Sequence, residues 1–201
     1  MESYEKIPDP RIFKTHCVFE YLPQTEGTKI ILSFRDPRDV CVSMYHHYND
    51  FSEETKEKMR LHGLTWESHF ETWMQRGAWF NAVKSWWPHQ KDDNVLLLRY
   101  EEMLQDLPGN IDRIIHFLGW PLSESEKEKV LNLVSFDWMK SNVSRFNKLS
   151  VDANPAFQRG FIRKGVAGDY KTLMTDEQEQ IILKRVREEL PAECVSFLQI
   201  Q

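Results

Sequence analysis

The stretch GFIRKGVAGDYKTLMT, residues 160–175, places three cations, Arg163, Lys164 and Lys171, among three glycines. Glycine adopts positive φ angles and lets the backbone approach a ligand closely, so such a loop can present both cations and main-chain N–H groups to one anion. The chain as a whole is acidic, with a formal net charge of −5. The loop therefore predicts a phosphate grip, and the alternative is a charged loop that is merely solvated.

A second candidate follows the apolar run KIILSF, residues 29–34. Arg35 comes directly after this run, and Ser43 lies further along the chain. In open α/β sheets, ligands bind beyond the carboxyl ends of the strands, and the planar fork of arginine suits phosphate. We therefore expect Arg35 and Ser43 to face an anion. The alternative is that Arg35 pairs with Asp36 or Asp39 and that Ser43 is an ordinary helix hydroxyl.

Strand and helix patterns alternate around these residues. KIILSF, and NVLLLRY at 94–100, are short continuous apolar runs, typical of parallel strands buried on both faces. Pro37 at a first helical position and capping boxes at Ser123 and Thr175 mark helix starts. The stretch 51–65 is expected to be a mobile loop and 140–168 to be mostly irregular. Helices are expected at 37–48, 66–89 (two, with an aromatic stripe facing the core), 108–119, 123–134 and 175–189.

Composition limits the class of protein. The chain has 201 residues, 41% of them hydrophobic, which fits one domain over residues 1–201. It lacks the run of about 18 to 20 apolar residues that a membrane span needs, and its acidity argues against nucleic-acid binding through bulk charge. The first residues, MESYEKIPDP, do not resemble a secretory signal. Cys17, Cys41 and Cys194 are widely spaced, so we expect no disulfide framework, no metal site and a cytoplasmic location.

Five segments together resemble the cytosolic sulfotransferases. FIRKGVAGDYKTLMT, at 161–175, is similar to the family signature R-K-G-x-x-G-D-W-K-x-x-x-T, and FKTH, at 13–16, resembles its K-T-H element. SFRDPRDVCVSMYHHY, RYEEM and VSFDWM, which begin at 33, 99 and 134, are similar to R-x-P-K-D-V-x-V-S-Y-Y-H, Y-E-D-M and T-S-F-x-x-M. The five occur in family order over nearly the whole chain.

The resemblance implies an α/β fold, in which a parallel sheet is flanked by helices in the P-loop-kinase-like sulfotransferase arrangement. It also names the anion as 3′-phosphoadenosine-5′-phosphosulfate (PAPS), the sulfuryl donor. Arg35 and Ser43 would hold its 3′-phosphate together with the cationic loop at 160–175, called the basic loop from here on. Phe136 would stack on the adenine, and Tyr100 would touch the same nucleoside. The implied nucleotide-binding residues are Arg35, Ser43, Tyr100, Val134, Phe136, Phe161, Ile162, Arg163, Lys164 and Gly165.

For catalysis, the resemblance assigns His16 as the general base that takes a proton from the hydroxyl or amine of a small-molecule acceptor. Histidine suits this task because its unperturbed pKa lies near neutrality. Lys14, in the same motif, is the second catalytic candidate.

The chain also departs from the family pattern. It contains no P-K-S-G-T-T-W segment, the loop that wraps the 5′-phosphosulfate in the family, so we expect a domain truncated at its amino terminus. Lys14 would replace the lysine of that loop only in part. The family's dimer motif is retained at Lys171 and Thr175 but is otherwise degenerate, so a homodimer is one possibility. The alternative function is a catalytically impaired module that only binds the 3′-phosphoadenosine nucleotide or a partner chain.

Overall fold

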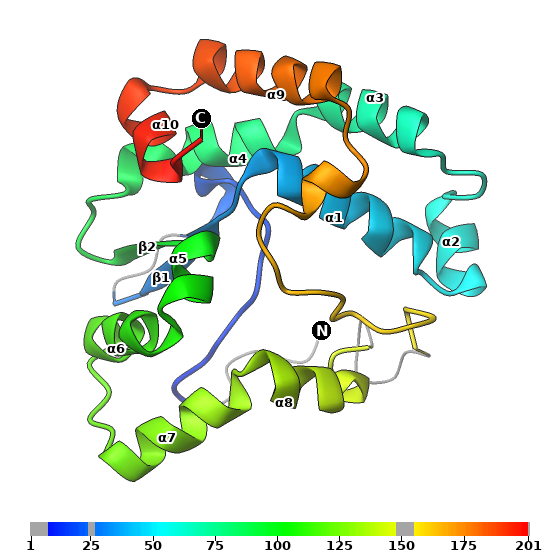
Figure 1. Cartoon of the computed structure of the whole chain (residues 1–201). Coiled ribbons are helices and arrows are strands. Elements are labelled where there is room, and N and C mark those ends of the chain that lie inside the picture. Colours follow the sequence, from blue (N-terminus) through cyan, green and yellow to red (C-terminus); the bar gives the residue numbers. More distant parts are fainter. Residues whose placement is uncertain (1–7, 24–26, 148–154, 201) are drawn as a thin grey trace.

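The computed structural model describes residues 8–23, 27–147 and 155–200 (Figure 1). Its centre is a pair of parallel strands, β1 (Ile30–Phe34) and β2 (Val95–Arg99). The register runs from Ile30 opposite Val95 to Phe34 opposite Arg99. Both strands and their parallel direction agree with the sequence prediction, to within one residue at each end.

The two strands differ in burial. Each residue of β2 is buried or half-buried, as expected for a strand covered on both faces. In β1, Ile30 and Phe34 are buried, whereas Ile31 and Ser33 are exposed. This alternation is the period-two pattern of a strand covered on one face. The prediction that β1 is buried on both faces was therefore wrong.

Helices pack around the sheet in two groups (Figure 1). The group at the top of the view contains α1 (Pro37–Asn49), α3 (Trp66–Arg76), α4 (Ala78–Trp86), α9 (Asp176–Glu189) and α10 (Ala192–Leu198). The lower group contains α5 (Tyr100–Gln105), α6 (Leu107–Leu118), α7 (Glu124–Leu133) and α8 (Phe136–Ser141). None of the helices within the described residues has the length and apolarity needed to cross a membrane.

The aromatic stripe of α3 and α4 lies in the core, as predicted. Trp73 is 7% exposed and Trp86 is 4% exposed, and both belong to one hydrophobic cluster with Ile182 and Val186 of α9. Burying a side chain of this size contributes about 1.5–3 kcal/mol. This cluster also includes Ile30 and Phe34 of β1 and Cys41 and Val42 of α1, so it fixes α1 next to the strands.

The stretch 51–65, predicted to be a loop, contains the helix α2 (Glu53–Met59). Ser52 caps it by accepting a hydrogen bond from the Thr55 N–H, and Lys56 pairs with Glu53 at 3.0 Å. The helix buries none of its residues. It therefore lacks the apolar periodicity from which a helix is read in a sequence.

The helix starts marked by sequence signals are confirmed. Asp36 caps α1, and complete capping boxes open α7 at Ser123 and α9 at Thr175. The short helices α5, α8 and α10 were not predicted. The segment 140–168 is mostly irregular where it is described, and its residues 148–154 lie outside the described residues.

The buried histidine of α3 makes stability depend on pH. His69 is 3% exposed, and its Nε2 donates to the Cys41 carbonyl at 3.0 Å. Burial lowers the pKa of His69 below its usual 6.5, although the bond to the Cys41 carbonyl acts in the opposite direction. As pH falls through about 6.5, His69 therefore binds a proton in the unfolded chain but not yet in the folded chain. The free energy of unfolding should consequently fall as pH drops below about 6.5.

We predict that His69→Gln, which keeps a donor for the carbonyl, makes the free energy of unfolding depend less steeply on pH between about 6.5 and 5. Urea unfolding at several pH values measures this slope. His116→Gln, at an exposed position of α6, is the control and should keep the wild-type slope. An unchanged slope in His69→Gln would contradict the assignment.

Candidate anion-binding site

The register of the sheet places the first two site residues side by side. Because Phe34 lies opposite Arg99, the residues that follow them, Arg35 and Tyr100, meet at the carboxyl ends of the strands. The Arg35 Cζ lies 4.4 Å from the centre of the Tyr100 ring, within the range of a cation–π contact. Arg35 Nη2 also donates to the Val166 carbonyl at 3.0 Å, which joins the strand end to the basic loop.

Two side chains hold the backbone at this strand end. Trp79 of α4 donates from Nε1 to the Arg35 carbonyl at 3.1 Å. Glu101 of α5 accepts from the Asp36 N–H at 3.0 Å. The turn between β1 and α1 is thus tied to the helix bundle on one side and to the end of β2 on the other.

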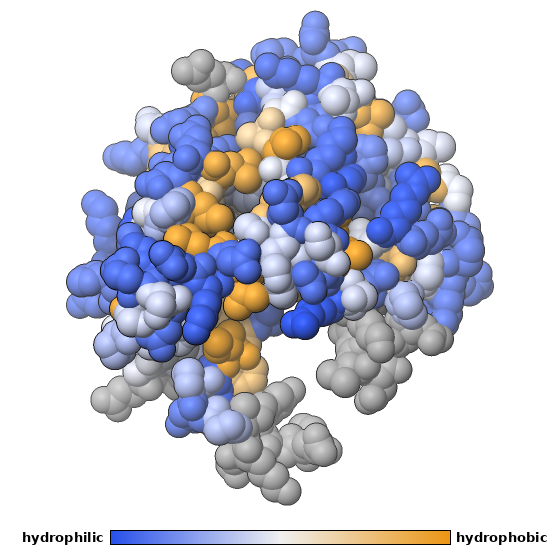
Figure 2. Space-filling view, turned by 60° about the horizontal axis from the view of Figure 1, so that its bottom comes forward, coloured by the Kyte–Doolittle hydropathy of each residue, from blue (hydrophilic) through white to orange (hydrophobic). Residues whose placement is uncertain are grey.

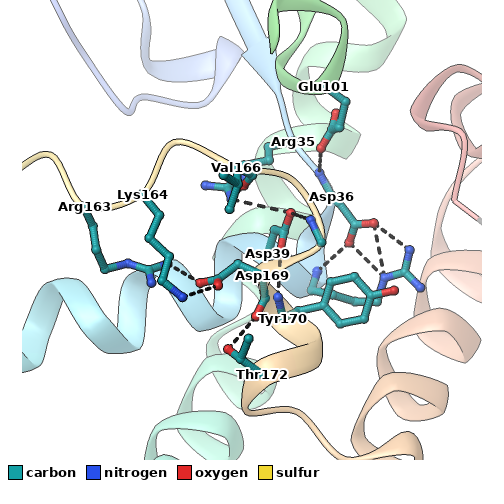
Figure 3. A network of polar contacts seen from close by, with 12 residues as sticks. Arg35, Asp36, Asp39, Glu101, Arg163, Lys164, Val166, Asp169, Tyr170 and Thr172 are labelled. Atoms are coloured by element: carbon teal, nitrogen blue, oxygen red, sulfur yellow. Dashed lines mark hydrogen bonds and ion pairs between the residues drawn. The ribbon is translucent and has the colours of Figure 1, made fainter. Parts of the chain in front are cut away.

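Asp39 joins the first turn of α1 to the basic loop (Figure 3). This residue is 1% exposed, and its carboxylate accepts the Gly168 N–H at 2.8 Å and the Tyr170 N–H at 3.0 Å. The same carboxylate lies 3.5 Å from Arg35 Nη2. Hydrogen bonds to a charged group contribute about 1.5–3 kcal/mol each. Asp39 therefore fixes where the loop approaches the strand end.

The cations of the loop are paired within the loop itself. Asp169 opens the short 3-10 helix η5 (Asp169–Thr172), and its carboxylate contacts Arg163 Nη2 at 2.5 Å and Lys164 Nζ at 2.7 Å. Its side chain is 5% exposed, against 33% for Arg163 and 50% for Lys164. Burial acts to raise the pKa of Asp169, but the hydrogen bonds from Lys164 and Arg163 outweigh it, so the pKa lies below its usual range.

These pairs answer one alternative raised by the sequence. Arg35 does pair with a nearby carboxylate, and its partner is Asp39, because Asp36 instead pairs with Arg38 at 2.6 Å. Arg35 retains donor capacity, since only its Nη2 is used in the hydrogen bonds and ion pairs of the described residues. An internal ion pair and an anion site are therefore compatible at this position.

Phe136 lies directly over Gly165. A Cβ atom placed on Gly165, where φ is +64°, would stand 2.5 Å from Cδ2 and 2.7 Å from Cε2 of the Phe136 ring. The two predicted site residues thus meet, although they belong to α8 and to the basic loop. Val134, the third predicted residue of this region, caps the end of α7 and is half-buried.

Lys14 lies near the first part of the loop. Its Nζ lies 5.6 Å from the centre of the Phe161 ring, which in turn lies 5.4 Å from the ring of His47. The carbonyl of Ile162 accepts a hydrogen bond from Lys140 Nζ of α8 at 2.5 Å. Lys14 therefore lies beside Phe161, whereas Ile162 is tied to α8.

The two remaining candidates are less firmly connected. His16 is exposed, and the next residue is held to α4 because the Trp86 Nε1 donates to the Cys17 carbonyl at 3.1 Å. Ser43 is half-buried in α1. Among the described residues, neither His16 nor Ser43 has a hydrogen bond or ion pair to the Asp39 and Asp169 network.

Two histidines of α1 face the same region. Burial, reinforced by Arg163, lowers the pKa of His46, and burial, reinforced by Lys14, lowers that of His47. Both are therefore neutral at pH 7, since the usual histidine pKa is about 6.5. The positive charge of the site comes from the lysine and arginine side chains.

Sequence reasoning missed several residues that build this site. Asp169, Lys140 and Trp79 fix the loop or the strand end, yet none was proposed from the sequence. Asp169 carried a detectable signal, because a carboxylate within a short cationic loop is well placed to pair with its neighbours. Trp79 carried none beyond its place in the aromatic stripe.

Comparison with known proteins identifies the family. The model of the sulfotransferase domain family matches residues 1–192. The chain belongs to the sulfotransferase family. Among curated relatives, sulfotransferase 2A1 of Macaca fascicularis is 34% identical to this sulfotransferase chain, and the match covers 90% of this chain. Sulfotransferase 1B1 of Canis lupus familiaris is 31% identical, and the match also covers 90% of this chain. The chain spans 64% and 62% of the length of these two relatives.

Solved structures agree with the fold of this sulfotransferase chain. Mouse sulfotransferase SULT7A1, complexed with PAP, superposes with a TM-score of 0.80 at 32% identity. The match covers 97% of this chain and 71% of the mouse chain. Retinol dehydratase, in complex with androsterone and the inactive cofactor PAP, gives a TM-score of 0.63 at 29% identity. This match covers 82% of this chain and 48% of the retinol dehydratase chain. The α/β sulfotransferase fold expected from the sequence is confirmed.

The contact between Phe136 and Gly165 gives a sharp test of the site. We predict that Gly165→Ala destabilises the fold by about 1–3 kcal/mol, because the methyl group meets the ring and the residue keeps a positive φ. Thermal and urea unfolding measure the change. Gly168→Ala is a matched control, since Gly168 also has a positive φ, +80°, but a Cβ there meets nothing within 4 Å. Equal losses in both variants would show that the ring contact contributes nothing.

Proposed function

We propose that this chain binds PAPS and belongs to a protein that transfers its sulfuryl group to a hydroxyl or amine of a small molecule. The observation that carries the proposal is the junction of the basic loop with Arg35 at the strand ends, held by Asp39. Support comes from the family, and from two structural neighbours whose structures contain PAP, the product nucleotide 3′-phosphoadenosine-5′-phosphate.

In this proposal the 3′-phosphate binds to Arg35, Arg163 and Lys164, with Ser43 and the Gly165 N–H as further donors. The side chains suit a phosphate. Arginine has five N–H donors and lysine three, and only some of these are used within the chain. In the hydrogen bonds and ion pairs of the described residues Arg35 uses only its Nη2, so its Nη1 remains as a donor.

The nucleoside would lie against exposed aromatic surface. Figure 2 shows a broken band of apolar side chains across an otherwise polar face. Phe136 and Phe161 remain 37% and 43% exposed, beside the basic loop. Aromatic faces of this kind stack on a purine. We assign Phe136, with Tyr100, to the adenosine, and we place Val134, Phe161 and Ile162 at its margin.

For catalysis we assign His16 and Lys14. His16 takes the proton of the acceptor hydroxyl or amine as the acceptor atom bonds to sulfur. The bond from sulfur to the bridging oxygen of the donor breaks, and the nucleotide leaves with that oxygen. Lys14 offsets the negative charge that gathers there. The contact of Lys14 with Phe161 supports this placement, because it brings the Lys14 ammonium group to the basic loop.

A second candidate function is nucleotide binding without sulfuryl transfer. It is favoured by the placement of His16, which is exposed and, among the described residues, has no hydrogen bond or ion pair to the Asp39 and Asp169 network. Homodimer formation through Lys171 and Thr175, and a cytoplasmic location, also stay predictions. In this structure Thr175 is the cap of α9.

We predict that the chain binds PAP and that Arg163→Ala weakens this binding by about 10- to 100-fold. Loss of one charge-assisted hydrogen bond costs about 1.5–3 kcal/mol, and 1.4 kcal/mol corresponds to tenfold. Isothermal titration calorimetry measures the affinity. Arg187→Ala, at an exposed position of α9, is the control and should bind like the wild type. Absence of PAP binding to the wild-type chain would refute both candidate functions.

A transfer assay separates the two candidates. The purified chain is incubated with labelled PAPS and a panel of phenols, alcohols and amines, and labelled products are separated. Transfer that is lost in His16→Ala, with PAP affinity unchanged, supports the enzyme. Binding of PAP without transfer to any acceptor supports the binding module.

A further inference from the structure

Asp169 lies behind the two cations of the basic loop. The cations are one-third and one-half exposed, whereas the Asp169 side chain is 5% exposed. The carboxylate therefore contacts Arg163 and Lys164 from the protein side and leaves their outer surface open to solvent. In Figure 3 both cationic side chains extend from the loop toward this one carboxylate.

The backbone around Asp169 is held in place as well. Its carbonyl accepts from the Thr172 hydroxyl at 2.7 Å, and the next residue, Tyr170, donates its N–H to Asp39 at 3.0 Å. Preceding it, Gly168 donates to the same carboxylate of Asp39 at 2.8 Å. Because both neighbours are bonded to the first turn of α1, Asp169 has little freedom to swing outward and release the cations.

Two roles for Asp169 can be distinguished. A competitor would occupy the cations when no ligand is bound and would have to leave when a phosphate arrives. A positioning residue would keep its contacts while the remaining donors bind the phosphate. The buried, fixed carboxylate and the outward-facing donors favour the second role, because a phosphate approaching from solvent meets the free side of both cations.

We propose that Asp169 is a positioning residue that orients Arg163 and Lys164 for the 3′-phosphate of the nucleotide and remains bonded to them in the complex. The inference rests on the proposed function. By this contact, two flexible side chains are ordered before the ligand binds, so less conformational freedom is lost on binding. Outer partners of this kind also orient the ligands of metal sites, where their loss typically weakens binding by about 10- to 100-fold.

The test compares two nucleotides that differ in the 3′-phosphate. Asp169→Asn keeps the shape of the side chain but loses its charge. We expect this variant to bind PAP about tenfold more weakly than the wild type and to bind adenosine 5′-monophosphate, which lacks the 3′-phosphate, with unchanged affinity. Asp176→Asn, an exposed position in the first turn of α9, is the matched control and should change neither affinity.

Tighter binding of PAP by Asp169→Asn would overturn the proposal, because it would make Asp169 a competitor. An equal loss for both nucleotides would also overturn it.

A further measurement uses the wild-type chain and remains decisive if Asp169→Asn does not fold. In a crystal structure of the wild-type chain with PAP, the carboxylate of Asp169 should still contact both cations while the 3′-phosphate lies on their other side. Release of either cation from Asp169 in the complex would overturn the proposal. Failure of the wild type to bind PAP would instead refute the proposed function, so the two failures are distinguishable.

Discussion

The candidate site depends on one buried carboxylate. Asp39 accepts two main-chain N–H groups of the basic loop and lies 3.5 Å from Arg35, so three segments are fixed at one point. A buried carboxylate is costly unless it is paired and hydrogen-bonded, and here both conditions are met. Its place in the first turn of α1 adds the favourable field of the helix amino terminus. Its bonds to Gly168 and Tyr170, together with the contact of Arg38 with the Tyr170 ring at 4.5 Å, hold the loop against α1.

Charge is arranged in layers around this point. Asp39 and Asp169 lie inside, Arg35, Arg163 and Lys164 lie outside them, and the neighbouring histidines of α1 are neutral. An acidic chain can therefore present a local cationic surface, since the inner carboxylates are shielded from solvent by the cations that they hold. The overall charge of −5 says little about this surface.

Local signals in the sequence predicted a large part of the fold. Continuous apolar runs located both strands, and capping boxes located the starts of α7 and α9, because these features depend on residues close together in the chain. The cations and glycines at 160–175 located the basic loop, and the place of Arg35 after an apolar run located that residue, whereas motif resemblance named the nucleotide. The bonds from Asp39 to the loop could not be predicted, since they join residues 129 and 131 positions apart. Helix α2 was missed because it buries no side chain, and the placement of His16 depends on an extended segment without a periodic pattern.

The pairing of Phe34 with Arg99 has a consequence for how this protein tolerates change. Arg35 and Tyr100 stay neighbours as long as the two strands keep their mutual alignment, however many residues separate them along the chain. Insertions in the surface helix α2 or its flanking turns would thus leave the cation–π contact in place. A single deletion inside either strand would shift one partner by about 3.3 Å and turn its side chain to the opposite face. Variation among descendants of this chain should accordingly accumulate between the strands and spare their interiors.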